Sequence, residues 1–210
     1  MDVNRRNFVR GAAAGAAGTA LAGGLLIGGA RSDAAASRSG VSPDQPSYEF
    51  DGEHQAGILR PAPANMQSFA SVTSFDLTAK NRDQLVGLLK ALTERARLMT
   101  HGGPVNDSGV GRPPLDSAVL GNAMPADGLT VTVSLGASVF DDRFGLQKLR
   151  PLHLTPMRVF PNDAPMPEWT GGDVMLQLCA NNPDTIHHAI RDITRHTRAG
   201  MQIRWKMQGY

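Results

Sequence analysis

Residues 171–183 read GGDVMLQLCANNP, and this stretch decides the predicted fold. The two glycines favour a turn, and the seven residues from 174 to 180 have the pattern of a strand. Side chains alternate along a strand, so a strand with apolar residues at every second position has one buried face. Here both faces are mostly apolar, which is typical of a strand in the middle of a sheet that is covered on both sides. One face carries Val174, Leu176, Leu178 and Ala180, and the other carries Met175, Gln177 and Cys179.

The end of this stretch predicts the start of a helix. Asn182 is suited to cap the helix, and Pro183 fits its first position, where a missing N–H costs nothing. Gln177 is the polar residue of the strand, and it either has a buried hydrogen-bond partner or marks a functional cavity. A single apolar stripe then follows at helical spacing, made of Ile186, Ala189, Ile190 and Ile193.

Residues 1–36 have the pattern of an export signal. Arg5 and Arg6 precede a weakly apolar run rich in Gly and Ala, residues 11–30. The segment resembles a twin-arginine signal, which implies export of a folded protein to the periplasm, the cell envelope or the outside. A membrane span needs about 20 strongly apolar residues, so we expect cleavage after Ala36, with an uncleaved anchor as the alternative. Residues 37–47 are expected to be a flexible linker, and residues 48–210 a single domain.

Composition excludes several classes of function. The formal net charge is +2, and residues 1–36 hold four arginines against two aspartates, so the remainder is neutral. A neutral domain without a clustered basic face is no candidate for nucleic-acid binding. The single cysteine, Cys179, excludes an intramolecular disulfide and a multi-cysteine metal site, and we expect an inert buried thiol.

The other predicted elements complete an α+β pattern. Asn81 with Gln84 predicts a capped start for a long amphipathic helix. The order strand, helix, strand, strand, helix, strand is that of the ferredoxin-like βαββαβ fold. It predicts a four-stranded antiparallel sheet with both helices on one face, with residues 174–180 inside it and the last strand at an edge with one wet face. The remaining expected pieces are an extended run at 50–58, strands at 68–76, 129–135 and 201–207, a loop at 101–128, a short helix at 140–149 and a proline-rich connection at 150–170.

Four stretches together resemble the amino-terminal half of a Dyp-type (dye-decolorizing) haem peroxidase of the exported deferrochelatase/peroxidase group. They are GEHQAGI at 52–58, LTVTVSLGASVFDDRFGL at 129–146, FPND at 160–163 and GGDVMLQLCANN at 171–182. The resemblance implies a peroxidase that uses hydrogen peroxide to oxidise dyes or porphyrin-like substrates, with iron release from haem as a further activity to test. It also implies haem b held mainly by a second ferredoxin-like half, and a homo-oligomer at full length.

The motif that carries the family's distal aspartate, Gly-x-x-Asp-Gly, does not occur here. Asp127-Gly128 has Met124 at the glycine position, and Asp51-Gly52 has Tyr48. We therefore assign no catalytic, cofactor-binding or metal residue, and we expect a truncated chain or a fragment that is inactive alone. The alternative is a haem-free ferredoxin-like module for binding or assembly.

Local substitutes for the missing residues are weak on sequence grounds. His187 and His188 are neighbours on a helix and point about 100° apart, so they cannot both bind one iron. His54 lies between two glycines in the extended run, where a structural hydrogen bond is the simpler role. Asp141, Asp142 and Arg143 form either an ion pair at a cavity rim or a helix cap. His101 and His153 lie in loops, and His196 suits the negative end of a helix.

Overall fold

The computed structural model describes residues 47–59, 66–104, 120–121 and 123–209. The predicted export signal and residues 37–46 of the predicted linker lie outside these ranges. In the described part of the chain, no helix is long and apolar enough to cross a membrane.

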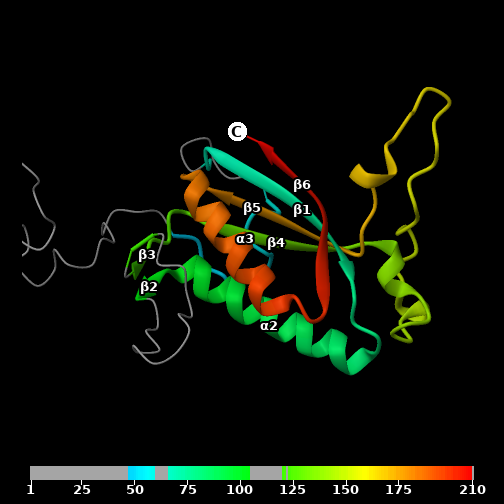
Figure 1. Ribbon diagram of the computed structural model, residues 1–210, viewed down its shortest axis with the longest axis horizontal. Helices are drawn as coiled ribbons and strands as arrows, with labels where there is room; N and C mark the ends of the chain where they lie inside the picture. The colour runs from blue at the N-terminus through cyan, green and yellow to red at the C-terminus, as the bar shows by residue number, and fades with distance from the viewer. Residues whose placement is uncertain (1–46, 60–65, 105–119, 122, 210) are drawn as a thin grey trace, which may run out of the picture. The chain divides into compact units, whose positions relative to one another are not determined.

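Four strands form one antiparallel sheet (Figure 1). They are β1 (Phe69–Leu77), β4 (Thr130–Leu135), β5 (Val174–Ala180) and β6 (Met201–Gly209). Their order across the sheet is β4-β5-β1-β6, so β5 is internal and β6 lies at an edge. This confirms the predicted ferredoxin-like topology and the predicted places of the two strands.

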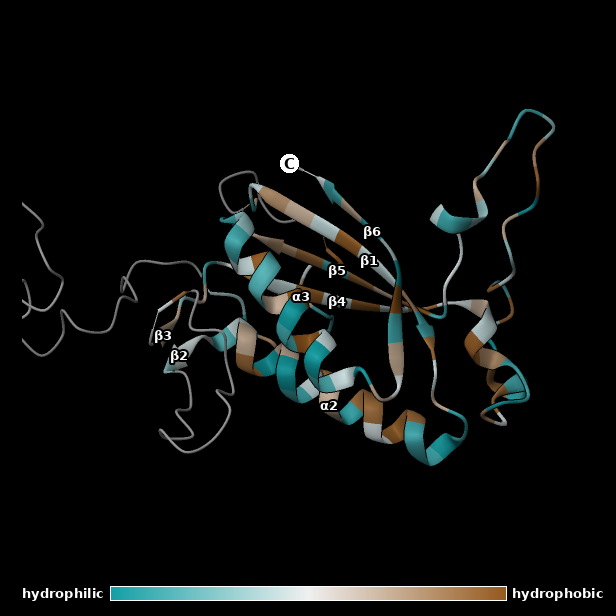
Figure 2. Cartoon of the chain, viewed as in Figure 1, coloured by the Kyte–Doolittle hydropathy of each residue, from teal (hydrophilic) through white to brown (hydrophobic). Residues whose placement is uncertain are grey.

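Two helices pack on one face of the sheet, as predicted. They are α2 (Arg82–His101) and α3 (Pro183–Thr197). The Asn81 side chain accepts from the Gln84 amide at 2.9 Å, which confirms the predicted cap of α2. Figure 2 shows hydrophobic residues along the central strands and mostly polar residues on the visible turns of α3. The core therefore lies between the helices and the sheet, and the four apolar residues of the α3 stripe are all buried in it.

The start of α3 is capped by a residue from another part of the chain. Asp127 is buried and lies just before β4, with a left-handed φ of 50° that Asp tolerates better than most residues. Its carboxylate accepts from the backbone N–H of Asn182 at 2.9 Å and from the Thr185 hydroxyl at 2.6 Å. The predicted cap by the Asn182 side chain is therefore wrong, because that side chain donates to Asp127 instead.

Several irregular segments differ from expectation. Residues 50–58 form bends and turns instead of an extended run. Residues 140–149 do not form one helix, because short 3₁₀ helices occupy Ala137–Phe140 and Gln147–Leu149. The connection at 150–170 contains a 3₁₀ turn at Pro167–Trp169, and the long loop contains a small β-bridge between β2 (Gly103–Pro104) and β3 (Ala123–Met124).

The second face of β5 is not covered as the sequence predicted. Val174, Leu176, Leu178 and Ala180 are buried under the helices, but Met175, Gln177 and Cys179 are only half-buried. The predicted buried thiol is thus half-exposed. The predicted single wet face of β6 is also wrong, because Ile203 and Met207 are exposed as well as the polar residues Gln202, Arg204 and Gln208. The β5 error arises because, in the described ranges, helices cover only one side of the sheet. The β6 error has a second cause, a register shift between Ser74 and Phe75 that puts Ile203 on the helix side and Met207 on the other side.

Candidate functional site

The stretch around Gln55 docks on the free edge of the sheet. The Gln55 carboxamide accepts from the Val133 amide at 2.9 Å and donates to the Val133 carbonyl at 3.2 Å. These are the two hydrogen bonds that a residue of a neighbouring strand would make with edge strand β4. The Thr132 hydroxyl donates to the Ala56 carbonyl at 2.7 Å. Two of the four sequence stretches therefore meet through a glutamine side chain that satisfies an exposed strand edge.

Gly57 is required where this segment crosses β4. Its φ is +90°, and a Cβ atom there would lie 2.6 Å from the Thr132 hydroxyl oxygen and 3.3 Å from that of Thr130. Any larger residue would be strained in conformation and would also push the segment off the strand. Gly57 therefore acts by permitting close packing.

A cluster of charged side chains joins the stretch at 129–146 to the stretch at 171–182, at the end of the sheet where β5 begins. Arg143 donates to both carboxylate oxygens of Asp173, at 3.1 and 3.2 Å, and its Nε donates to Asp141 at 2.6 Å. Asp173 also accepts from the Leu77 amide at 2.8 Å and from the Ser138 hydroxyl. The predicted ion pair of Arg143 is thus present, but it links a loop to the sheet and lines none of the hollows described below.

The burial of Asp173 is balanced by its donors. Burial alone would raise the pKa of the Asp173 carboxyl, but hydrogen bonds from Arg143, Ser138 and the Leu77 amide outweigh it and hold that pKa below its ordinary value. The bond to Asp173 likewise raises the pKa of the Arg143 guanidinium, against the opposite effect of burial. Both groups are therefore charged at neutral pH, and their role is to hold the loop.

The histidines do not converge on one place. His54 is exposed on a turn, not in a strand, and His153 is also exposed. Ring nitrogens of His101 and His196 contact the carbonyl oxygens of Arg97 and Asp192. His187 is exposed beside Gln208, whereas His188 is buried, so the two side chains lie in different surroundings.

The described residues do not fit a haem group. A haem ligand needs a donor atom that faces a cavity able to hold the porphyrin. His187 lines a hollow of about 330 Å³ between the ends of β1, β6 and α3, but its ring contacts Gln208. Among the described residues, no three His, Cys, Asp or Glu side chains lie close enough together to bind a metal ion. We therefore derive no chemical step through haem for this part of the chain.

The sheet face opposite the helices is the feature that most needs a partner. Its centre consists of five side chains that the strand registers place side by side, and we call these the open face: Val72, Met175, Gln177, Cys179 and Met207. Four are half-buried and Met207 is 56% exposed. Gln177 contacts the sulfur of the half-buried Cys179 at 3.7 Å, so it lacks the fully buried partner that was one of the two expectations. An apolar sheet face of this kind is normally packed against a second layer.

The sequence did not identify Asp127, Asp173 and Ser138 as residues whose side chains hold other segments by hydrogen bonds. The glycine pair before Asp173 was the available signal, because both glycines have positive φ and bring the chain close to β1. A Cβ atom on Gly172 would lie 1.9 Å from the Ser74 hydroxyl, which donates to the Gly171 carbonyl. The turn therefore places Asp173 over the end of β1, where the Leu77 amide meets its carboxylate.

Comparisons with known proteins agree with this architecture. A family model described as "Dyp-type peroxidase, N-terminal" matches residues 55–210. A deferrochelatase of Yersinia pestis is 42% identical over 198 residues, which cover 90% of this chain and 44% of that protein. The crystal structure of a DyP-type peroxidase from Cellulomonas bogoriensis matches with a TM-score of 0.66 and 31% identity, over 81% of this chain and 44% of that one. Ferric DtpA from Streptomyces lividans matches with a TM-score of 0.66 and 33% identity, over 79% and 42%.

The chain thus spans a little under half the length of these relatives. The matched region holds the whole four-stranded sheet, both helices and the Arg143–Asp173 cluster. The protein therefore belongs to the Dyp-type peroxidase family, and its described domain corresponds to the N-terminal part of that family.

Proposed function

We propose that this chain is the N-terminal portion of an exported, haem-dependent peroxidase, and that its open face packs against the second half of the full-length enzyme. The observation that carries the proposal is the half-exposed apolar sheet face, in a chain whose relatives are about twice as long. A ferredoxin-like sheet with helices on one side leaves its other side free for a second layer. The hydrogen bonds between Gln55 and Val133 at the sheet edge, and those between Arg143 and Asp173, keep that surface in a fixed shape.

In this proposal the catalytic groups belong to the second half. Haem b, when bound there, supplies the peroxide-driven redox chemistry. The described half supplies one side of the interface with the second half. Side chains such as Val72 and Met175 exclude water from that interface. Peroxidation of dyes or porphyrin-like compounds is proposed because the structural relatives are named DyP-type peroxidases, and iron release from haem because a relative is named deferrochelatase.

The test is haem titration of the purified 210-residue chain, followed by its Soret absorption. We expect weak haem binding and almost no peroxide-dependent dye bleaching, because no described side chain fits an axial ligand. Co-expression with the C-terminal half of the Yersinia pestis relative should restore tight haem binding and peroxide-dependent dye bleaching. Tight stoichiometric haem with turnover in the chain alone would overturn the proposal. Folding and association with that half without any haem would support the alternative, a haem-free binding or assembly module.

A matched pair of variants tests the role of the open face. Val72→Lys places a cation at the centre of the open face, and Val86→Lys places one on an exposed position of α2. A lysine that association would bury without a partner costs several kcal/mol, so Val72→Lys should prevent recovery of haem while Val86→Lys should not. Equal recovery of haem by the two variants would mean that the second half packs on a surface other than the open face.

A further inference from the structure

An apolar cavity lies between α2, β4 and the segment at residues 48–56. Its volume is about 350 Å³. Leu92, Ala96 and Val131 form its floor and are buried, and Phe50 and Ala56 close it from the side of the segment. It lies on the helix side of the sheet, whereas the open face lies on the other side. It is therefore a separate feature.

The polar side chains next to the floor of the cavity are engaged by the protein, and the charged residue of the lining, Glu49, is exposed. The Thr100 hydroxyl donates to the Arg97 carbonyl, and the Thr93 hydroxyl donates to the Leu89 carbonyl at 2.8 Å. The Gln55 carboxamide is engaged by Val133. A ligand inside would therefore meet mainly hydrocarbon surface, and burying a charge there without a partner would be costly.

The segment over the cavity is attached at two points. At one end Arg97 lies over the Phe50 ring at 5.0 Å and forms an exposed ion pair with Asp51 at 3.1 Å. At the other end Gln55 and Ala56 bond to β4. The residues between these points, 52–54, are exposed. Exposed ion pairs contribute little to stability, so the attachment at Arg97 is the weaker of the two.

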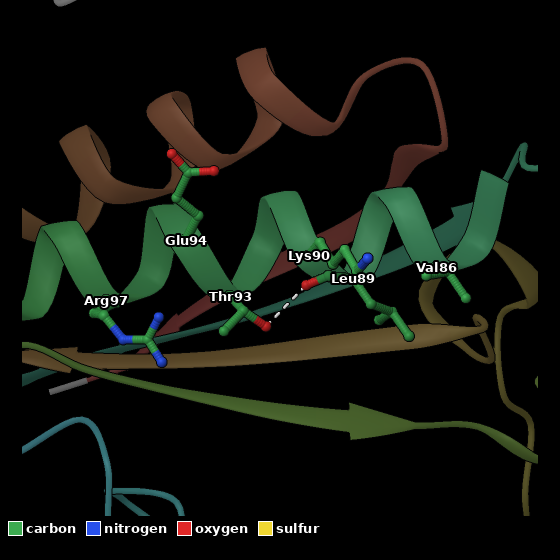
Figure 3. Close-up of a pocket in the computed structure, with 6 residues that line it drawn as sticks. All are labelled: Val86, Leu89, Lys90, Thr93, Glu94 and Arg97. Atoms are coloured by element: carbon green, nitrogen blue, oxygen red, sulfur yellow. Dashed lines mark hydrogen bonds between the residues drawn. The ribbon is translucent and has the colours of Figure 1, made fainter. Parts of the chain in front are cut away.

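A surface groove on α2 lies next to the cavity. The groove has a volume of about 400 Å³ and shares Leu89 and Thr93 with the cavity. Figure 3 shows Leu89, Thr93 and Arg97 on one side of the helix, with Glu94 extending from the other side. Arg97, which makes the weaker attachment, lines the groove.

We propose that this cavity binds a small, uncharged, apolar ring compound, with the segment 48–56 as its cover and the groove on α2 as its entrance. An apolar cavity of about 150 Å³ is large enough for benzene, so the larger volume here suits a molecule of two fused rings. The inference is independent of haem and of the second half, because the residues from which it is argued belong to the described part of this chain.

The test is titration of the 210-residue chain with indole, followed by backbone amide signals in NMR spectra. Indole should shift the signals of residues that line the cavity, with saturation. Ala96→Leu fills the floor and should weaken binding by about tenfold or more, as expected when a pocket loses space for part of its ligand. Ala91→Leu is the same change on the same helix at a position outside the cavity, and it should leave the affinity unchanged.

Phe50→Ala provides a second variant in case Ala96→Leu fails to fold, because it removes a wall that belongs to the cover and not to the core. It should also weaken indole binding by about tenfold. Saturable binding that is weakened by these changes and not by Ala91→Leu supports the site. The absence of saturable shifts in the unmodified chain, or equal affinity in the Phe50→Ala variant, would overturn it. Neither result depends on haem or peroxide, so this inference and the proposed function can fail separately.

Discussion

Asp173→Ala should be among the most destabilising single changes outside the hydrophobic core. The carboxylate is buried and accepts from a backbone amide, a hydroxyl and both terminal nitrogens of Arg143. Removing one partner of a buried ion pair costs about 3–5 kcal/mol. The Arg143 side chain is 35% exposed, and water can solvate it after the change, which reduces that cost. The Leu77 amide remains buried without its acceptor, a loss of about 1–3 kcal/mol. We expect a total near 3 kcal/mol.

The assay is urea unfolding at neutral pH, followed by tryptophan fluorescence. Asp142→Ala is the control, because this neighbouring aspartate is exposed and should contribute less than about 0.5 kcal/mol. The folded-state pKa of Asp173 is depressed, so its contribution is present above its unfolded pKa near 3.8 and is lost as the pH falls through the lower folded value. The stability difference between wild type and Asp173→Ala should therefore shrink below about pH 4. A stability difference under about 0.5 kcal/mol at neutral pH, or one that does not shrink in acid, would refute the stabilising role of the Asp173 carboxylate.

Three further changes test other parts of the molecule. Leu176→Asp should unfold the domain, because it buries a charge in the internal strand at a cost of several kcal/mol, whereas Leu135→Asp, at a 39% exposed strand end, should be much milder in thermal unfolding. Asp127→Ala should lower the free energy of unfolding by about 2–3 kcal/mol, because the start of α3 loses its acceptor. If urea unfolding shows a loss no larger than that of an exposed aspartate, Asp127 does not stabilise the start of α3. Arg5→Lys combined with Arg6→Lys should keep the protein in the cytoplasm in a fractionation assay, and unchanged export would contradict the twin-arginine interpretation.

The regular elements could be predicted because their signals are local. The alternation in Val174–Ala180 and the pairing of Asn81 with Gln84 each depend on residues a few positions apart. The order of such elements then restricts the topology to a few choices, of which the ferredoxin-like one places the most apolar strand inside. The prediction of burial on both faces of β5 failed because composition shows that a surface is apolar. It does not show whether a described element of the chain covers that surface.

The contacts that hold the irregular segments could not be predicted because they join residues far apart in sequence. Asp127 reaches Asn182 across 55 positions, Arg143 reaches Asp173 across 30, and Gln55 reaches Val133 across 78. Nothing in the local sequence distinguishes these side chains from solvated ones. The glycines are the partial exception, because a pair such as Gly171-Gly172 signals a tight turn, though not the Asp173 contacts that the turn makes possible.

The residues by which this chain resembles its family therefore have a structural role in the described half. Gln55 closes a strand edge, Gly57 permits a close crossing, and Arg143 with Asp173 fixes a loop to the sheet. None of these side chains lies on the open face, yet each holds a segment beside it. If the proposed function holds, loss of activity after a change at one of these positions would thus arise through the shape of the surface offered to the proposed second half. Such a variant should lose stability and haem recovery together, whereas Val72→Lys should lose haem recovery while the chain stays folded. That contrast separates residues that build this domain from residues that join it to the second half in the proposed function.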